Sequence, residues 1–172
     1  YSYSGIIYNS IRGKSRHTSL ISNLHFISCR FGVDSNGVND NNVTIIAGNK
    51  INDCWGGILL LNDIDHVFVM NNHISNMQAM SGTAIGVNSK NDNHKIFIQN
   101  NIISQILVGI SVFEGNVEII HNQIRKGKGT STGISLNDVF QAKVEGNFIS
   151  ETDFGLEIYD SRKIVDVSII NN

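Results

Sequence analysis

Three acidic side chains have a spacing that suits acid–base chemistry on a glycosidic bond. Asp138 and Asp160 each follow an alternating apolar segment, and Glu157 lies within the second of these segments. Glycosidases use two carboxyl groups roughly 5 to 9.5 Å apart, and two stacked strands, about 4.8 Å apart, can supply such a pair. These residues are therefore candidate catalytic residues. The alternative is that Asp138 and Asp160 bond to the backbone of turns, as aspartates after strands commonly do.

Two aromatic and two amide residues are candidates for binding a saccharide. Phe113 and Tyr159 occupy outward positions in segments of the same kind, and so do Asn88 and Asn137. Aromatic faces stack on sugar rings, whereas amides bind hydroxyl groups. We therefore predict that these four residues line a substrate-binding groove. The alternative is an ordinary solvated strand face, on which such residues are also common.

A short basic segment predicts a glycine-punctuated loop. It contains Arg125, Lys126 and Lys128. A lyase needs a base and a positive group that stabilises the carboxylate of a uronic acid. Arg125 and Lys128 are therefore further candidates for binding an acidic polysaccharide. A solvated turn is the alternative interpretation of the same residues.

The histidines and cysteines do not predict a metal site. The six histidines fall at unrelated positions of the repeat described below, and Cys29 and Cys54 lack the short spacing of a metal-binding pair. Two cysteines are too few for the disulfide framework of a small secreted domain, so we interpret both as small core residues. We expect no cofactor.

Charge and length exclude several classes of protein. With 172 residues and a net charge of -2, the chain lacks the basic footprint of a nucleic-acid-binding protein. Its longest apolar runs, such as residues 58–61, fall far short of the roughly 20 residues of a membrane span. We expect one domain over residues 1–172. Because both ends fall inside repeat units, we expect this domain to be part of a longer protein.

The elements that would position these residues are repeated strands. The phrase apolar-x-apolar-x-x-Asn-x-apolar recurs, most clearly from Val67 to Ile74. A second phrase, Gly-Ile-x-apolar, lies upstream of it, as in residues 57–60 and 133–136. The Asn position of the first phrase falls, with a mean step of about 24 residues, at Cys29, Asn49, Asn72, Asn101, Asn122, Asn147 and Asn172.

This pattern predicts an all-β solenoid, a single-stranded right-handed parallel β-helix of about seven coils. Inward-pointing Ile and Val would stack in columns. An Asn at each tight turn can adopt the left-handed conformation and bond to its neighbours above and below. A leucine-rich-repeat-like solenoid is the alternative, because its strand signature is similar. The excess of Ile over Leu, the second strand phrase and the lack of a helical segment after the Asn favour the β-helix.

The outward positions of the Asn-containing phrase include an apolar run. Ile45, Phe68 and Phe97 occupy equivalent positions in three successive coils. An exposed apolar stripe usually marks contact with a partner or with a covering segment. We predict either a homotrimer or a covering segment of the same protein at this stripe.

The paired phrases Gly-Ile-x-Leu and Ile-x-x-Asn-x-Ile resemble the right-handed parallel β-helix repeats of the pectate-lyase-like superfamily, over nearly the whole chain. That superfamily includes polysaccharide lyases, glycoside hydrolases, homotrimeric phage tailspikes and a periplasmic copper-maturation family. The resemblance implies a polysaccharide partner and an extracellular or virion-surface location. The chain lacks the Gly-His-Gly and Arg-x-Lys motifs of polygalacturonases and the proline-containing arginine motif of pectate lyases. Without clustered Met, His or Cys, a copper role is disfavoured.

Two functions of different classes follow from the sequence. The first is a polysaccharide-binding module of a secreted enzyme or phage tailspike, which in its stronger form also degrades the polysaccharide. The second is a non-catalytic structural or adhesive spacer that assembles through the apolar stripe. Titration with glycans tests the first function, and sedimentation tests the second.

Overall fold

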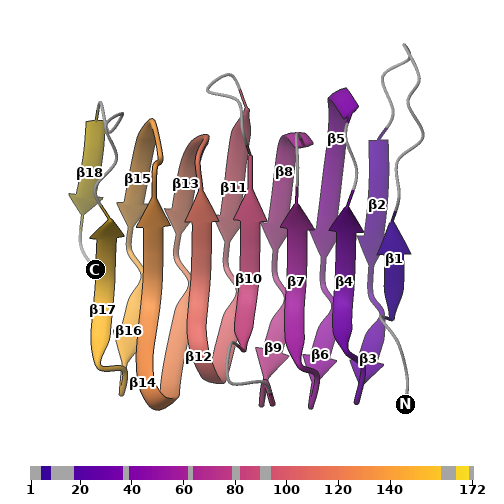
Figure 1. The fold of residues 1–172 in the computed structure, drawn as a ribbon, viewed down its shortest axis with the longest axis horizontal. Coiled ribbons are helices and arrows are strands. Elements are labelled where there is room, and N and C mark those ends of the chain that lie inside the picture. Colours follow the sequence, from indigo (N-terminus) through magenta and orange to yellow (C-terminus); the bar gives the residue numbers. More distant parts are fainter. Residues whose placement is uncertain are drawn as a thin grey trace.

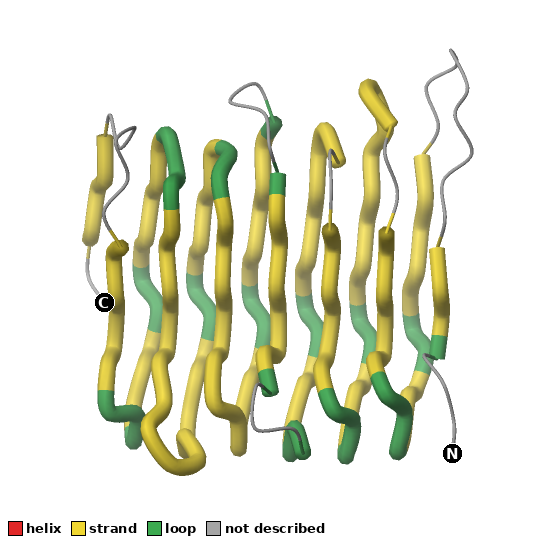
Figure 2. Tube along the Cα trace, in the orientation of Figure 1, coloured by secondary structure: helices red, strands yellow, loops and turns green. Residues whose placement is uncertain are grey.

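The computed structural model describes residues 5–8, 18–36, 39–61, 64–78, 82–89, 94–159 and 166–170. These residues form eighteen β-strands, and no helix occurs among them. The strands stack side by side along the long axis of the molecule, in parallel pairs (Figure 1). Figure 2 shows the short turns and loops that join successive strands within each coil.

The chain winds through three faces, each of which collects one strand from every coil. The first face holds β1 (Ile6–Tyr8), β4 (Phe31–Asn36), β7 (Gly56–Leu61), β10 (Thr83–Asn88), the C-terminal parts of β12 (Ile102–Phe113) and β14 (Gln123–Asn137), and β17 (Phe154–Tyr159). The second face holds β2 (Thr18–Ser22), β5 (Asn39–Ala47), β8 (Ile64–Met70), β11 (Lys95–Gln99), β13 (Asn116–Ile120), β15 (Gln141–Glu145) and β18 (Asp166–Ile170). The third face holds β3 (His25–Ile27), β6 (Lys50–Asn52), β9 (His73–Ser75), the N-terminal parts of β12 and β14, and β16 (Phe148–Ser150).

This topology confirms the predicted parallel β-solenoid. The second face is a sheet in the order β18-β15-β13-β11-β8-β5-β2, so each strand pairs with the equivalent strand of the next coil. The leucine-rich-repeat alternative is wrong, because a third strand follows the Asn in the described coils. Six coils, from β1 to β16, carry a strand on each of the three faces, and β17 and β18 belong to a further coil. The predicted count of about seven is therefore slightly high for complete coils.

Columns of β-branched side chains form the core. On the first face the inward column contains Val33, Ile58, Ile85, Ile110 and Ile134, each at most 1% exposed. Burying one such side chain stabilises the fold by roughly 1.5–3 kcal/mol. Because each coil is narrow, most inward positions are apolar, and this requirement produces the repeat that is visible in the sequence.

A ladder of asparagines runs along the inside of the turn between the second and third faces. Its members, all at most 2% exposed, are Asn49, Asn72, Asn101, Asn122 and Asn147. Asn101 is typical: its Oδ1 accepts from the backbone N–H and the Nδ2 of Asn72, each at 3.0 Å. Its own Nδ2 donates to the carbonyl of Val69 at 2.9 Å and to Oδ1 of Asn122 at 3.0 Å. The side chains of Asn49, Asn72, Asn101 and Asn122 each bind the coils on both sides in this way.

The ladder asparagines do not themselves adopt the left-handed conformation, contrary to our expectation. The residue before each of them does, as in Asn71, Asn100 and His121, with φ of 57°, 56° and 55°. This arrangement turns the chain one residue early, so that the next side chain points inward and its amide reaches the neighbouring coils. A residue with positive φ is therefore required before the ladder position rather than at it.

The first coil corrects our assignment of Cys29 to the ladder column. Ile21 pairs with Ile46, and Phe26 pairs with Ile51, so Leu24 lies opposite Asn49. The N–H of Leu24 donates to Oδ1 of Asn49 at 3.0 Å, as expected at the ladder position. In the correct copy of the Asn-containing phrase, Ser19 occupies the first position, which is apolar in the other copies. The sequence pattern therefore did not reveal this copy. The phrase from Leu24 to Phe31 therefore matched the repeat in the wrong frame.

Candidate functional site

The first face brings together the four residues predicted to bind a saccharide. Asn88 lies opposite Phe113, Phe113 opposite Asn137, and Asn137 opposite Tyr159, in direct register over four coils. Their side chains point outward from the ends of β10, β12, β14 and β17. Phe113 is 43% exposed and Tyr159 is 48% exposed. We call these four residues the amide–aromatic column.

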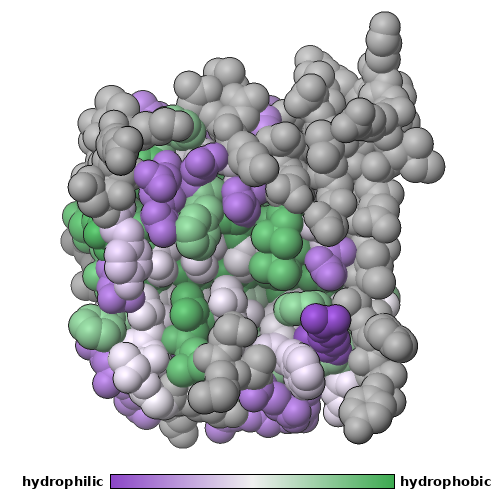
Figure 3. All heavy atoms as spheres, in the orientation of Figure 1, coloured by the Kyte–Doolittle hydropathy of each residue, from purple (hydrophilic) through white to green (hydrophobic). Residues whose placement is uncertain are grey.

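A shallow depression adjoins this column where Gly86 interrupts a second outward column. Gly86 lies opposite Leu59 on one side and Ser111 on the other, and it lines a hollow of about 230 Å³. Figure 3 shows this face, with hydrophobic side chains gathered over its middle and hydrophilic ones around them. The hollow contains no charged side chain and is lined by Leu59, Leu61, Thr83, Gly86, Val87, Asn88, Ser111 and Phe113.

Gly86 was not singled out from the sequence as part of a site. The signal was present, because Gly86 stands at a strand position where the neighbouring coils carry a side chain. A glycine inside a strand weakens that strand and often marks the close approach of a ligand or of another backbone. A Cβ at Gly86 would lie 2.9 Å from the flexible end of Leu59 and 3.6 Å from the Thr83 methyl group, and it would meet no backbone atom. The backbone therefore does not require glycine here.

Glu157 lies on the first face, where it is held by two hydroxyl groups. The Thr132 hydroxyl donates to Oε2 of Glu157 at 2.6 Å. A hydrogen bond from Tyr159 to the Glu157 carboxylate raises the pKa of the Tyr159 hydroxyl above its ordinary value. This network fixes Glu157 and Tyr159 in place at the end of the amide–aromatic column.

The remaining carboxylate candidates do not form a close pair with Glu157 within the described residues. Asp138 occupies the turn after β14 and is left-handed, with φ of 54°, which fits its interpretation as a turn residue. It lies one coil and three residues along the strand from Glu157, a Cα separation of roughly 11 Å. Asp160 lies outside the described residues. A catalytic role for these three residues stays a prediction.

The basic segment is part of a strand on another face, not the loop that we predicted. Arg125 lies in the N-terminal part of β14, opposite Ser104 of the preceding coil and Ser150 of the following one. Its guanidinium carbon lies 4.8 Å from the centre of the Phe148 ring. The backbone of Lys128 also lies in β14, but its side chain is outside the described part of the structure. Arg125 therefore belongs to the third face, apart from the amide–aromatic column.

The predicted apolar stripe lies on the second face and extends one coil further than expected. Phe68 and Phe97 stack with their ring centres 4.8 Å apart and their planes 5° apart. Ile45 pairs with Phe68, and Leu20 pairs with Ile45. Leu20 is 64% exposed, whereas the other three are half-buried. Correcting the first coil thus adds Leu20 to the apolar stripe.

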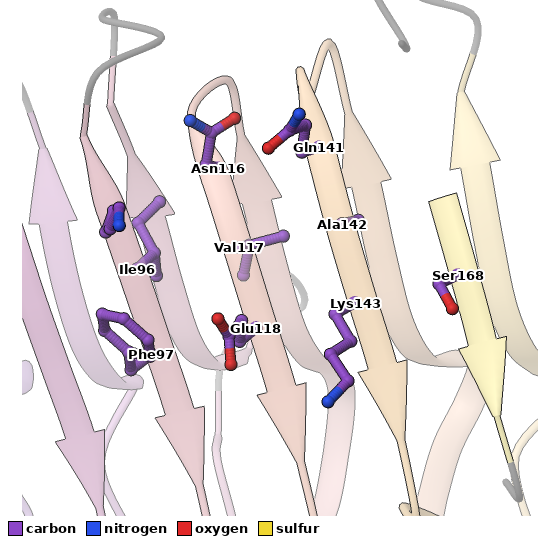
Figure 4. Close-up of a pocket in the computed structure, with 10 residues that line it drawn as sticks. Ile96, Phe97, Asn116, Val117, Glu118, Gln141, Ala142, Lys143 and Ser168 are labelled. Carbon is purple, nitrogen blue, oxygen red and sulfur yellow. The ribbon is translucent and has the colours of Figure 1, made fainter. Parts of the chain in front are cut away.

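Beyond Phe97 the second face becomes polar and hollow. A depression of about 350 Å³ spans β11, β13, β15 and β18. Figure 4 shows Phe97, Glu118, Lys143 and Ser168 in a row along neighbouring strands. Lys143 Nζ lies 2.6 Å from Oε2 of Glu145; this contact raises the pKa of Lys143 and lowers that of Glu145. The two hollows therefore differ in chemistry, because charged groups of both signs line the second one.

Within the described ranges, no group of three or more His, Cys, Asp or Glu side chains could hold a metal ion. In the same part of the chain, no helix is long and apolar enough to cross a membrane.

Comparison with known families agrees with this geometry. The family described as the right-handed β-helix region matches residues 36–172, and the chain belongs to this family. The match supplies the handedness of the solenoid and confirms the predicted β-helix repeat. Neither the curated protein sequences nor the solved structures contain a match to the chain.

Proposed function

We propose that the first face binds a neutral saccharide that extends across several coils. The observation that carries this proposal is the uncharged hollow at Gly86, which is continuous with the amide–aromatic column through Asn88 and Phe113. Concave sites with an apolar lining and a few polar groups are typical of small-ligand binding. The module would hold a glycan chain with its long axis across the strands.

The amide–aromatic column has the chemistry that a row of sugar units requires. The exposed ring of Phe113 offers a face for the C–H groups of a pyranose, and the amides of Asn88 and Asn137 both donate and accept hydrogen bonds with hydroxyl groups. Phe113 and Tyr159 are two coils apart, about 9.6 Å. This distance suits sugar units that stack at alternate coils, with amides between them.

Charge favours a neutral glycan over an acidic one. In the described strands of the first face, the charged residues are Asp34 and Glu157, both acidic. A uronate carboxylate would be repelled there, and Arg125 is engaged with Phe148 on the third face. The proposal therefore concerns neutral hexose polymers rather than the acidic polysaccharides that the basic segment suggested.

Isothermal titration with neutral oligosaccharides of four to eight units tests the proposal, with oligouronates in parallel. Gly86→Val should fill the hollow and abolish the heat of binding, and Phe113→Ala should weaken binding about tenfold through loss of stacking. Ser135→Val, in the same column as Gly86 but outside the hollow, and Arg125→Gln are the matched controls and should bind as the unmodified chain does. Equal loss in all four variants, or binding of uronates alone, would contradict the proposal.

Cleavage of the bound glycan is a separate hypothesis. Glu157 lies two residues from Tyr159 in β17 and accepts a hydrogen bond from its hydroxyl, and Asp138 or Asp160 is its predicted partner. A digest that follows both reducing ends and the ultraviolet absorbance of unsaturated uronates distinguishes a hydrolase from a lyase. Reducing ends that appear without absorbance, and are lost in Glu157→Gln, would support hydrolysis. Unchanged glycan in every digest would leave binding as the function.

The apolar stripe favours a second candidate function, a module that assembles with another copy of itself. Four apolar side chains, Leu20, Ile45, Phe68 and Phe97, are continuous over four coils, which is the kind of patch that marks a contact surface. Sedimentation over a range of concentrations tests this function. Association should be lost in Leu20→Lys and kept in Ile102→Lys, an exposed apolar position of the third face. A monomer at every concentration would contradict it.

A further inference from the structure

Cys29 and Cys54 occupy the same position in two successive coils. The strands that flank them are paired in direct register, β3 with β6 before the cysteines and β4 with β7 after them. The connecting turn has three residues in both coils, and the cysteine is the middle one. The two cysteines therefore stack on each other, although 25 residues separate them in the sequence.

The two turns also share one conformation. The residues before the cysteines, Ser28 and Asp53, are both left-handed, with φ of 54° and 56°. The N–H of Trp55 donates to the carbonyl of Cys29 at 3.1 Å, which ties the second turn onto the first. Stacked backbones of this kind lie about 4.8 Å apart. That separation is within the Cα–Cα range of roughly 4.4–6.8 Å that a disulfide spans.

The two thiols point in the same direction but differ in exposure. Each Sγ donates to the carbonyl two residues earlier, Cys29 to Ile27 at 3.6 Å and Cys54 to Asn52 at 3.3 Å. Cys54 is fully buried, whereas Cys29 is partly exposed. Burial is the main cause that raises the pKa of the Cys54 thiol to about 11. A dissolved oxidant can therefore reach Cys29 first.

We propose that Cys29 and Cys54 form an intercoil disulfide in the presence of a small disulfide oxidant, such as oxidised glutathione. The Cys29 thiolate attacks one sulfur of the oxidant, breaks its S–S bond and releases one thiolate, which leaves a mixed disulfide. The Cys54 thiolate then attacks Cys29 Sγ and releases the second thiolate. The protein loses two electrons and two protons, and the oxidant becomes two thiols. This inference does not depend on saccharide binding.

The bond would fasten two coils that are otherwise held together by stacking and hydrogen bonds. Closing a loop of this length restricts the unfolded chain and should raise Tm by roughly 5–10 °C. Formation of the disulfide needs the Cys54 thiolate. Because the pKa of Cys54 is about 11, the deprotonated fraction of this thiol increases about tenfold with each pH unit below that value. Closure should therefore be faster at pH 9 than at pH 7.

Incubation of the full chain in glutathione redox buffers, followed by mass spectrometry of an unreduced digest and by thermal melting, tests the proposal. We expect the loss of two hydrogen atoms, a linked pair of peptides that contain residues 29 and 54, and a rise in Tm that a reductant reverses. A glutathione adduct that persists on Cys29, or disulfides between chains with no 29–54 peptide, would overturn it.

Two variants separate the disulfide from general effects of the oxidant. Cys29→Ser changes a partly exposed turn residue, so the fold should persist, and its Tm should be the same with and without oxidant. Cys54→Ala is the reciprocal control and should accumulate the mixed disulfide on Cys29. If Cys29→Ser gains the same rise in Tm as the unmodified chain, the proposed bond is not its cause.

Discussion

Asparagine has opposite roles in two regions of this solenoid. In the ladder, Asn72, Asn101 and Asn122 are buried and bond to the coils on both sides. On the first face, Asn88 and Asn137 are half-exposed and alternate with aromatic residues. The same amide thus stabilises the fold where it points inward and is available to a ligand where it points outward. In a stacked coil, identical residues mark the positions that hold the coils together, and variation marks the positions that are free to bind.

The difference between the two regions has an energetic cause. A ladder amide saturates buried donors and acceptors that have no access to water, and each such group would cost roughly 1–3 kcal/mol if it were left unpaired. An outward amide can exchange its partners with water at little cost. Loss of a ladder amide should therefore cost more stability than loss of an outward amide.

The largest expected effect breaks the ladder. Asn101→Leu removes the acceptor of Asn72 and the donor to Val69 and should lower the free energy of unfolding by about 4 kcal/mol. Urea denaturation measures this change. Asn137→Leu, the same substitution on the first face, is the matched control and should change stability by no more than about 0.5 kcal/mol. Equal losses in the two variants would refute the contrast between the regions.

A smaller effect separates two glycines of the same face. A Cβ at Gly109 would lie 2.4 Å from the carbonyl oxygen of Gly133 in the next coil, so Gly109→Ala should push two coils apart and cost about 2 kcal/mol. At Gly86 a Cβ would meet only side-chain atoms, those of Leu59 and Thr83, and Gly86→Ala should be nearly neutral. Thermal melting of both variants measures the difference. Similar melting temperatures would show that Gly109 does not limit the approach of the coils.

The smallest effect concerns a hydrogen-bonded carboxylate in the turn before β17. The backbone N–H and then the hydroxyl of Ser131 lower the pKa of Asp153. Because the folded pKa lies below the unfolded value of about 3.8, the stabilisation is present above that value and is lost as the pH falls through the folded pKa.

Asp153→Asn should therefore melt at a lower temperature than the unmodified chain at pH 7, and the two melting temperatures should converge as the pH falls through the folded pKa of Asp153. Ser131→Ala removes the hydroxyl donor and should reproduce part of the same pH dependence. A difference between Asp153→Asn and the unmodified chain that stays constant from pH 7 to pH 3 would show that this hydrogen bond does not act through the carboxylate.

The sequence predicted the repeat well where every position of a coil followed the pattern. The columns through Phe68 and Phe97, and through Asn88 and Phe113, have the register that the repeat predicted. The first coil was assigned wrongly because Ser19 replaces an apolar residue, so a shifted frame matched equally well. Frame errors of this kind arise where one polar residue enters an inward position, because the pattern depends on few residues per coil.

The candidate site was predicted only in part for a related reason. Phe113 and Tyr159 were recognised because aromatic residues carry an obvious binding chemistry. Gly86 was not recognised, because a hollow depends on how the surrounding side chains pack, and the sequence does not show this packing. Arg125 was assigned to a loop because of its glycine neighbours, although β14 continues through them and carries the side chain onto the third face.

The sequence by itself determined the solenoid, its inward columns and its ladder, because the inside of a narrow coil is filled mainly by apolar residues and paired amides. The tertiary structure alone decided which outward residues share a face and where that face is hollow. It also stacked Cys29 on Cys54, which their separation in the sequence conceals. The physical reason is that the core imposes one rule on every coil, whereas the outer surface depends on the length and conformation of each turn.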